Sequence, residues 1–97
     1  MYDIEFTSSA IEDLKALKKS EQPEILDGIE SQLRHEPSVE TRNRKRLHPN
    51  PVAEWELRIG RFRVFYNIEE QVRIVSVEAV GFKIGNLLFI RKERGEL

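Results

Sequence analysis

The chain opens on a strict alternation of apolar and polar residues. Tyr2, Ile4 and Phe6 occupy every second position, and the acidic residues Asp3 and Glu5 stand between them. Successive side chains of a β-strand point to opposite faces, so this period of two predicts a half-buried strand over residues 2–6.

The spacing of apolar residues then changes to that of two amphipathic helices. Ser9 is followed three residues later by Glu12, a capping-box pattern that predicts a helix from Ser9 to near Ser20. Pro23 suits the first turn of a second helix, and Pro37 forbids its continuation. The apolar stripes are Ile11, Leu14 and Leu17 in the first helix, and Ile25, Leu26, Ile29 and Leu33 in the second.

The period of two returns in the second half of the chain. Residues 53–59, 61–68 and 72–80 are typical of three strands, and the short loops between them predict an antiparallel meander. Residues 38–52, which precede these strands, are expected to form a basic connector that ends in a rigid turn around Asn50. Residues 82–97 have no decisive period, and we expect a short helix over the sheet edge there.

The order strand, helix, helix, strand, strand, strand predicts an α+β fold. In this fold a two-helix hairpin packs on one face of a small, mainly antiparallel, four-stranded sheet. The 97 residues contain no internal repeat and no marked boundary, and this length suits one hydrophobic core. We therefore expect a single domain over residues 1–97.

The composition excludes several classes of chemistry. Cysteine is absent, so no disulfide framework and no thiolate metal site is available. The two histidines are isolated, and the sequence predicts neither a metal nor another cofactor. The start lacks the pattern of a signal peptide, and no apolar run approaches the ~20 residues of a membrane span. We expect a cytoplasmic protein that does not enter the membrane.

The charges are unevenly divided along the chain. Residues 1–41 carry ten acidic and four basic residues, a balance of −6, whereas residues 42–97 carry twelve basic and seven acidic residues, a balance of +5. This asymmetry is compatible with a basic face that meets phosphates or an acidic protein partner. It is also compatible with two ordinary solvated surfaces, so the charge balance alone does not decide.

The segment WELRIGRFRVFY, residues 55–66, predicts a β-hairpin with a two-residue turn at Gly60-Arg61. In this register Arg58 lies opposite Arg63 on the outer face of the sheet, which points away from the helices. The inner face takes Trp55, Leu57, Ile59, Phe62, Val64 and Tyr66. Like charges directly opposite one another destabilise a sheet by up to ~1 kcal/mol, so folding gives no reason for the arginine pair.

Two interpretations of this pair are open. Solvent can screen both guanidinium groups, with Glu56 or Glu78 as a compensating charge. Alternatively, the outer face presents exposed, planar, permanently charged donors that bind a phosphate. Basic residues before, within and after the hairpin favour the second interpretation. Those that we expect to bind nucleic-acid phosphates are Arg42, Arg44, Lys45, Arg46 and Arg61, and Lys83 follows the last strand.

From Arg46 to Gly81 the chain resembles the RelE/ParE superfamily of bacterial type II toxins. The resemblance lies in WELRIGRFRVFYNI, a short turn and VRIVSVEAVG, within a chain of matching element order and length. It implies a toxin of a type II toxin-antitoxin system, with a cognate antitoxin as its partner. The superfamily includes both ribosome-dependent mRNA endonucleases and gyrase inhibitors, so the resemblance specifies the fold better than the activity.

For the nuclease branch, the resemblance implies metal-free cleavage of mRNA on the ribosome, in which a ribose 2′-oxygen attacks the adjacent phosphate. Arg63 and Arg58, and less closely Lys83, correspond to the basic residues that stabilise this phosphate. The resemblance leaves the general base unassigned. The available groups are His48, Glu56 and Glu78, and we include His48 among the candidate catalytic residues.

Two positions depart from the nuclease pattern. Phe89 stands where that branch has a tyrosine that assists proton transfer, and Glu56 stands where it has a second lysine. These departures favour a non-enzymatic gyrase inhibitor of the ParE type, or an inactive relative that only binds its antitoxin. The arginine pair and the basic connector favour the nuclease, which is our leading hypothesis.

Overall fold

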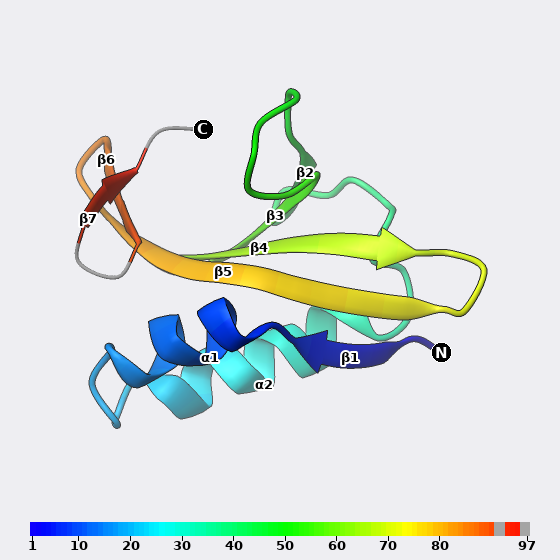
Figure 1. Cartoon of the computed structure of the whole chain (residues 1–97), viewed down its shortest axis with the longest axis horizontal. Helices are drawn as coiled ribbons and strands as arrows, with labels where there is room; N and C mark the ends of the chain where they lie inside the picture. The colour runs from blue at the N-terminus through cyan, green and yellow to red at the C-terminus, as the bar shows by residue number, and fades with distance from the viewer. Residues whose placement is uncertain (91–92, 96–97) are drawn as a thin grey trace.

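The computed structural model describes the backbone of residues 1–90 and 93–95 and the side chains of residues 1–90. The predicted α+β class is confirmed, and both helices lie on one face of the sheet (Figure 1). In the described residues the sheet has seven strands rather than the predicted four. The elements are β1 (Asp3–Phe6), α1 (Ser8–Lys15), α2 (Gln22–Leu33), β2 (Arg44–Arg46), β3 (Trp55–Ile59), β4 (Phe62–Glu69), β5 (Ile74–Ile84), β6 (Leu87–Ile90) and β7 (Glu93–Gly95).

The first helix begins earlier than the sequence predicts. Its N-cap is Thr7, whose hydroxyl oxygen accepts a hydrogen bond from the Ala10 amide at 3.1 Å, so the predicted cap at Ser9 is wrong. This start turns Ala10, Asp13 and Leu14 toward the sheet and leaves Ile11, a member of the predicted apolar stripe, exposed.

The second helix follows its prediction more closely. It carries Pro23 in its first turn and ends before Pro37. Ile25, Ile29 and Leu33 are buried, while Leu26 is 41% exposed. No helix in the described part of the chain is long and apolar enough to cross a membrane.

The sheet order is β2-β3-β4-β5-β6-β7, and the central strand β5 pairs with three others, β4, β6 and β1. One edge of β5 pairs with β4. The other edge pairs with β1, in parallel, over residues 74–77, and with β6, antiparallel, over residues 81–84. The parallel pairing of β1 explains why the sheet is only mainly antiparallel.

A gap of three residues on β5 separates its pairing with β1 from its pairing with β6, and α1 fills this gap. The Thr7 hydroxyl donates to the Glu78 carbonyl at 3.2 Å, and the Val80 amide donates to Asp13 Oδ2 at 2.9 Å. Asp13 is only 1% exposed. Backbone groups that have no strand partner are thus satisfied by side chains, as burial requires.

The register between β3 and β4 is the predicted one. Arg58 pairs with Arg63 and Trp55 with Tyr66, and Gly60 begins the turn with φ +56°. The predicted register between β4 and β5 is wrong, because Tyr66 pairs with Val77 instead of Val75. The register shifts at this point, where Glu78 is an extra residue of β5, and a bulge of this kind gives no clear sequence signal.

Two segments that were predicted as non-strand contain strands. The basic connector includes β2, and the tail continues β5 to Ile84 and then turns back as β6 instead of forming a helix. Gly85, with φ +60°, supplies the turn between β5 and β6. Residues 91, 92, 96 and 97 of the predicted tail helix lie outside the described residues.

The sheet buries side chains on both of its faces. The inner face and the helices form the larger core, which includes Leu57, Val64 and Tyr66, all 0% exposed. The Tyr66 hydroxyl donates to the Pro37 carbonyl at 2.7 Å, and burial raises the pKa of Tyr66. The outer face carries a second, smaller cluster formed by Ala53, Phe65, Ala79 and Leu88, with Leu47, Val52 and Ile90 packed against it.

Candidate nucleic-acid interface

Arg58 and Arg63 are paired across the β3–β4 hairpin, as predicted, but their environments differ. Arg58 is exposed, whereas Arg63 is only 7% exposed. The expectation that both guanidinium groups are exposed is therefore wrong for Arg63. The strand that carries Arg63 also contributes Phe65 to the outer cluster, so this part of the outer face is packed rather than solvated.

The Arg63 guanidinium is fixed in place by the backbone of its own hairpin. Its Nη1 donates to the carbonyl oxygens of Gly60, at 2.8 Å, and Phe62, at 2.9 Å. Its Nε–H is buried without a hydrogen-bond partner. No carboxylate in residues 1–90 lies within ion-pair distance of Arg63.

Within residues 1–90, the charge on Arg63 therefore has no direct partner of opposite charge. Desolvation lowers the pKa of Arg63, and the neighbouring charge of Arg58 lowers it further, while the charge of Glu56 acts in the opposite direction. A buried cation without a carboxylate partner favours an anion nearby that offsets its charge.

Two lysines share the outer face with the arginine pair. The β2–β3 register places Lys45 opposite Glu56, and the β5–β6 register places Lys83 opposite Leu88 of the outer cluster. Gly81 is the β5 neighbour of Arg63 and leaves the position beside it without a side chain. Of the predicted site residues, the structure thus brings Lys45, Arg58, Arg63 and Lys83 to one face.

Arg44 does not belong to this face. Its Nε donates to the Val39 carbonyl at 2.9 Å and its Nη1 to the Gln32 carbonyl at 2.7 Å. These bonds hold the end of α2 and the segment after it against β2. Its donors are used within the fold and its strand position faces the inner side, so the structure does not bring Arg44 to the arginine pair.

Arg61 also lies elsewhere. It forms an ion pair with Glu21 at 2.5 Å, and its guanidinium lies 4.7 Å from the ring centre of Phe62 and 5.1 Å from that of Phe82. Arg61 lowers the pKa of Glu21 through this contact. Arg61 therefore connects the hairpin turn to the helices and does not join Arg63.

The remaining basic residues of the connector lie at the sheet edge. Arg46 forms an ion pair with Glu54 at 3.6 Å and lies 5.8 Å from the ring centre of Trp55. Arg42 is exposed in the loop before β2. Arg46 is thus engaged at the edge of the sheet, whereas Arg42 directly precedes Asn43, whose carbonyl accepts from the Arg58 amide at 2.8 Å.

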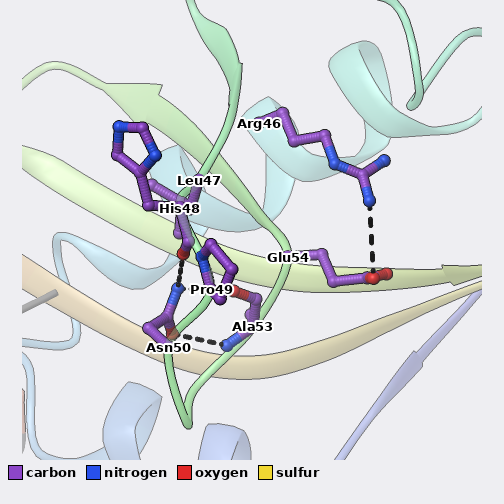
Figure 2. Close-up of a pocket in the computed structure, with 7 residues that line it drawn as sticks. All are labelled: Arg46, Leu47, His48, Pro49, Asn50, Ala53 and Glu54. Carbon is purple, nitrogen blue, oxygen red and sulfur yellow. Dashed lines mark hydrogen bonds and ion pairs between the residues drawn. The ribbon is translucent and has the colours of Figure 1, made fainter.

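His48 is exposed in the loop between β2 and β3. This loop encloses a shallow pocket of about 310 Å³, shown in Figure 2, lined by Arg46, Leu47, His48, Pro49, Asn50, Ala53 and Glu54. The Asn50 amide closes the loop by donating to the His48 carbonyl at 2.8 Å and the Ala53 carbonyl at 2.9 Å. The His48 ring points away from this turn (Figure 2). In the described residues, no hydrogen bond joins the His48 side chain to Arg58 or Arg63.

Phe89 is on the other face of the sheet from Arg63. It pairs with Phe82, and the two rings are stacked with their centres 5.5 Å apart. Phe82 packs against the inner core. Phe89 is thus a packing residue, and its position does not supply a group to the arginine pair.

Sequence reasoning missed the outer cluster and Gly81. The run Phe62 to Tyr66 contains two consecutive large aromatic residues, Phe65 and Tyr66, and this break in the alternation was the available signal for burial on both faces. A Cβ atom on Gly81 would lie 2.4 Å from the Phe89 carbonyl oxygen. The described residues contain no group of three or more histidine, cysteine or acidic residues arranged to hold a metal ion.

The structure is a small α+β domain whose β3–β4 hairpin carries two facing arginines on a basic outer face. Comparison with known proteins identifies the family of this domain. Residues 4–81 match the model of the family described as the ParE toxin of type II toxin-antitoxin systems, parDE. The chain belongs to this family. It is a type II toxin of the RelE/ParE superfamily.

Solved structures show the same fold. A chain of the RelBE2 toxin-antitoxin complex from Mycobacterium tuberculosis matches with a TM-score of 0.73 and 24% identity, covering 84% of this chain and 98% of that one. A chain of the archaeal RelE-RelB complex from Pyrococcus horikoshii matches with a TM-score of 0.67 and 17% identity, covering 88% and 97%. No curated protein sequence gives a significant match.

Proposed function

We propose that this toxin is a ribosome-dependent mRNA endonuclease and that its outer face binds the phosphate at which the RNA is cut. The observation that carries the proposal is Arg63, a guanidinium only 7% exposed, hydrogen-bonded in place, with a free Nε–H and no paired carboxylate in residues 1–90. Keeping such a charge costs stability, and a phosphate bound at the outer face would offset the charge.

In the proposed reaction the ribose 2′-oxygen attacks the adjacent phosphorus and the bond to the 5′-oxygen breaks. The products are a 2′,3′-cyclic phosphate and a 5′-hydroxyl. The phosphate gains negative charge as the new bond forms, and cations that are already in position stabilise this charge without reorganisation. Arg63 meets this requirement because two carbonyl groups hold it, and Arg58 faces it across the hairpin.

Messenger RNA and the ribosome are the proposed partners in the reaction, which takes place in the cytoplasm. We further propose a cognate antitoxin that covers the outer face. Two observations support an antitoxin: the related solved structures are toxin-antitoxin complexes, and the outer face carries a charge that an acidic segment would complement.

Gyrase inhibition without catalysis is the second candidate function. It is favoured by Phe89, which is stacked on Phe82 and does not supply an ionisable group to the outer face. Within residues 1–90 no hydrogen bond joins the His48 side chain to either arginine of the pair. The two functions differ in their macromolecular target, so cells distinguish them directly.

The test is inducible expression of the toxin in a bacterium, with primer extension on abundant transcripts and a parallel assay of the DNA-damage response. Wild-type toxin is expected to create new transcript ends while the DNA-damage response stays silent. The double variant Arg58→Ala, Arg63→Met should lose these ends. Arg73→Lys is the matched control, because Arg73 lies over the Tyr2 ring at the far end of β5.

Intact transcripts together with DNA damage would replace the proposal by gyrase inhibition. A well-expressed wild-type protein with no growth defect would identify a relative that only binds its antitoxin. Cleavage that persists in the double variant would remove the arginine pair from the site.

A further inference from the structure

Glu56 is an acidic residue in the middle of the basic outer face. It lies opposite Lys45 of β2, and on the same strand it is two residues from Arg58, which faces Arg63. It is half-buried, and its charge is felt by Arg63. A carboxylate in this place works against the binding of a phosphate, so its presence needs a reason.

Glu56 also differs from other acidic residues that lie near arginines. Glu21, Glu30 and Glu54 each form an ion pair with an arginine. Glu56 has Lys45, Arg58 and Arg63 as neighbours, yet within residues 1–90 it forms neither an ion pair nor a side-chain hydrogen bond. Its carboxylate oxygens therefore remain available to a ligand.

The chemistry of RNA cleavage supplies a use for this free acceptor. The 2′-hydroxyl must lose its proton as it attacks, and a general base has to lie within hydrogen-bond reach of that proton. The 2′-oxygen is bonded to the carbon next to the one that bears the scissile phosphate, so a phosphate held at Arg58 and Arg63 brings the hydroxyl close to the same pair of strands. Glu56 is the nearest carboxylate to the pair along β3.

We infer that Glu56 is the catalytic base that removes the 2′-hydroxyl proton. The inference rests on the proposed endonuclease function. The Glu56 carboxylate takes the proton, the 2′-oxygen forms a bond to phosphorus, and the bond from phosphorus to the 5′-oxygen breaks. The departing 5′-oxygen takes a proton from solvent water, and Glu56 later returns its proton to solvent.

A purely structural role for Glu56 predicts different behaviour. If Glu56 only offsets the repulsion between the arginines, its removal changes stability and RNA binding and leaves the proton-transfer step intact. The experiment therefore has to separate cleavage from binding and from folding.

The experiment measures single-turnover cleavage of mRNA on programmed ribosomes across a range of pH. Glu56→Gln keeps the size of the side chain and should lower the rate about 10²- to 10⁴-fold, the range for loss of a general base. Binding to a messenger with 2′-deoxyribose at the cut site should be unchanged or tighter. The wild-type rate should rise with pH on its acidic side, and Glu56→Gln should lack this rise.

The charged groups that surround Glu56 are included in this pH prediction. They are Lys45 from β2, Arg58 from β3, Glu54 just before β3, and Arg63 from β4. Glu69→Gln is the matched control, because Glu69 is an exposed acid at the end of β4, and it should keep both rate and pH profile. Glu56→Asp keeps a carboxylate and should give an intermediate rate with the acidic limb retained.

The outcomes separate the two claims. Wild-type toxin that never cuts the messenger would refute the endonuclease function itself. Cleavage by wild type together with an equal rate or an unchanged acidic limb in Glu56→Gln would overturn the role of Glu56 alone. Glu56→Asp that is no faster than Glu56→Gln would overturn it as well.

Discussion

The two faces of the sheet use the same strands for different purposes. The inner face is continuous with the helices and buries aliphatic and aromatic side chains throughout, such as Ile25, Leu57 and Val64. Among the side chains of residues 1–90, the outer face has a small apolar cluster, and beside that cluster the cation Arg63 is buried. Burial on the inner face stabilises the fold, whereas burial of the Arg63 charge on the outer face lowers its stability.

Stability explains the residues of the inner face, but it does not explain the burial of Arg63 on the outer face. Each apolar residue of the inner face is accounted for by the area it removes from water. The buried Arg63 guanidinium, which has no carboxylate partner within residues 1–90, has no such account, because its desolvation is only partly offset by two carbonyl groups. The outer face therefore indicates function, and variants on the two faces should separate stability from toxicity.

The largest loss of stability is expected from Trp55→Ala on the inner face. Trp55 is 5% exposed and stacks on Tyr66 with ring centres 6.0 Å apart. Truncation should lower the free energy of unfolding by about 3–5 kcal/mol, a large part of what a domain of this size has. Thermal unfolding followed by circular dichroism measures it. Ile84→Ala, at a position 61% exposed, is the control and should change little.

A smaller loss is expected from Gly81→Ala. The new Cβ atom would lie 2.4 Å from the backbone oxygen of Phe89, which no side-chain rotation can relieve. We expect a cost of about 1–3 kcal/mol and faster hydrogen exchange in β6 than in β3. Gly28→Ala is the matched control, because its close contacts are with the movable side chain of Ile59. Equal costs in the two variants would contradict the tight β5–β6 contact.

The smallest change in stability, with the largest change in function, is expected from Arg63→Met. Removal of a desolvated charge and loss of two hydrogen bonds oppose one another, so the free energy of unfolding should shift by less than about 1 kcal/mol. Loss of a preorganised cation should lower the cleavage rate about 10²- to 10³-fold. Chemical denaturation and the cleavage assay measure the two effects. Destabilisation without loss of toxicity would reverse the assignment of the two faces.

Regular alternation made the central hairpin predictable. Gly60 fixed the turn, and the apolar residues of β3 and β4 fixed which face was inner, so the opposition of Arg58 and Arg63 followed. Helix α2 could also be predicted from the sequence, because Pro23 and Pro37 mark its limits. In each case a strong local signal agreed with the tertiary arrangement.

Other features depended on contacts that are distant in sequence. The bulge that shifts β5 relative to β4, and the side-chain bonds from α1 that fill the gap on β5, leave no local pattern. Arg44 and Arg63 were assigned by charge and spacing alone. The burial of Arg63 and the internal bonds of Arg44 arise from the packing of Phe65 and the end of α2, which no short window of sequence contains.

The three-residue gap on β5 has a consequence for the order of assembly. Asp13, which holds the Val80 amide, stands 67 positions before it in the chain. The segment synthesised first is thus fully secured only when one of the last strands arrives, and contacts with such a long loop to close form slowly. This contact is therefore expected to form in one of the slower steps of folding, and it completes the edge of β5, the strand next to the one that carries Arg63.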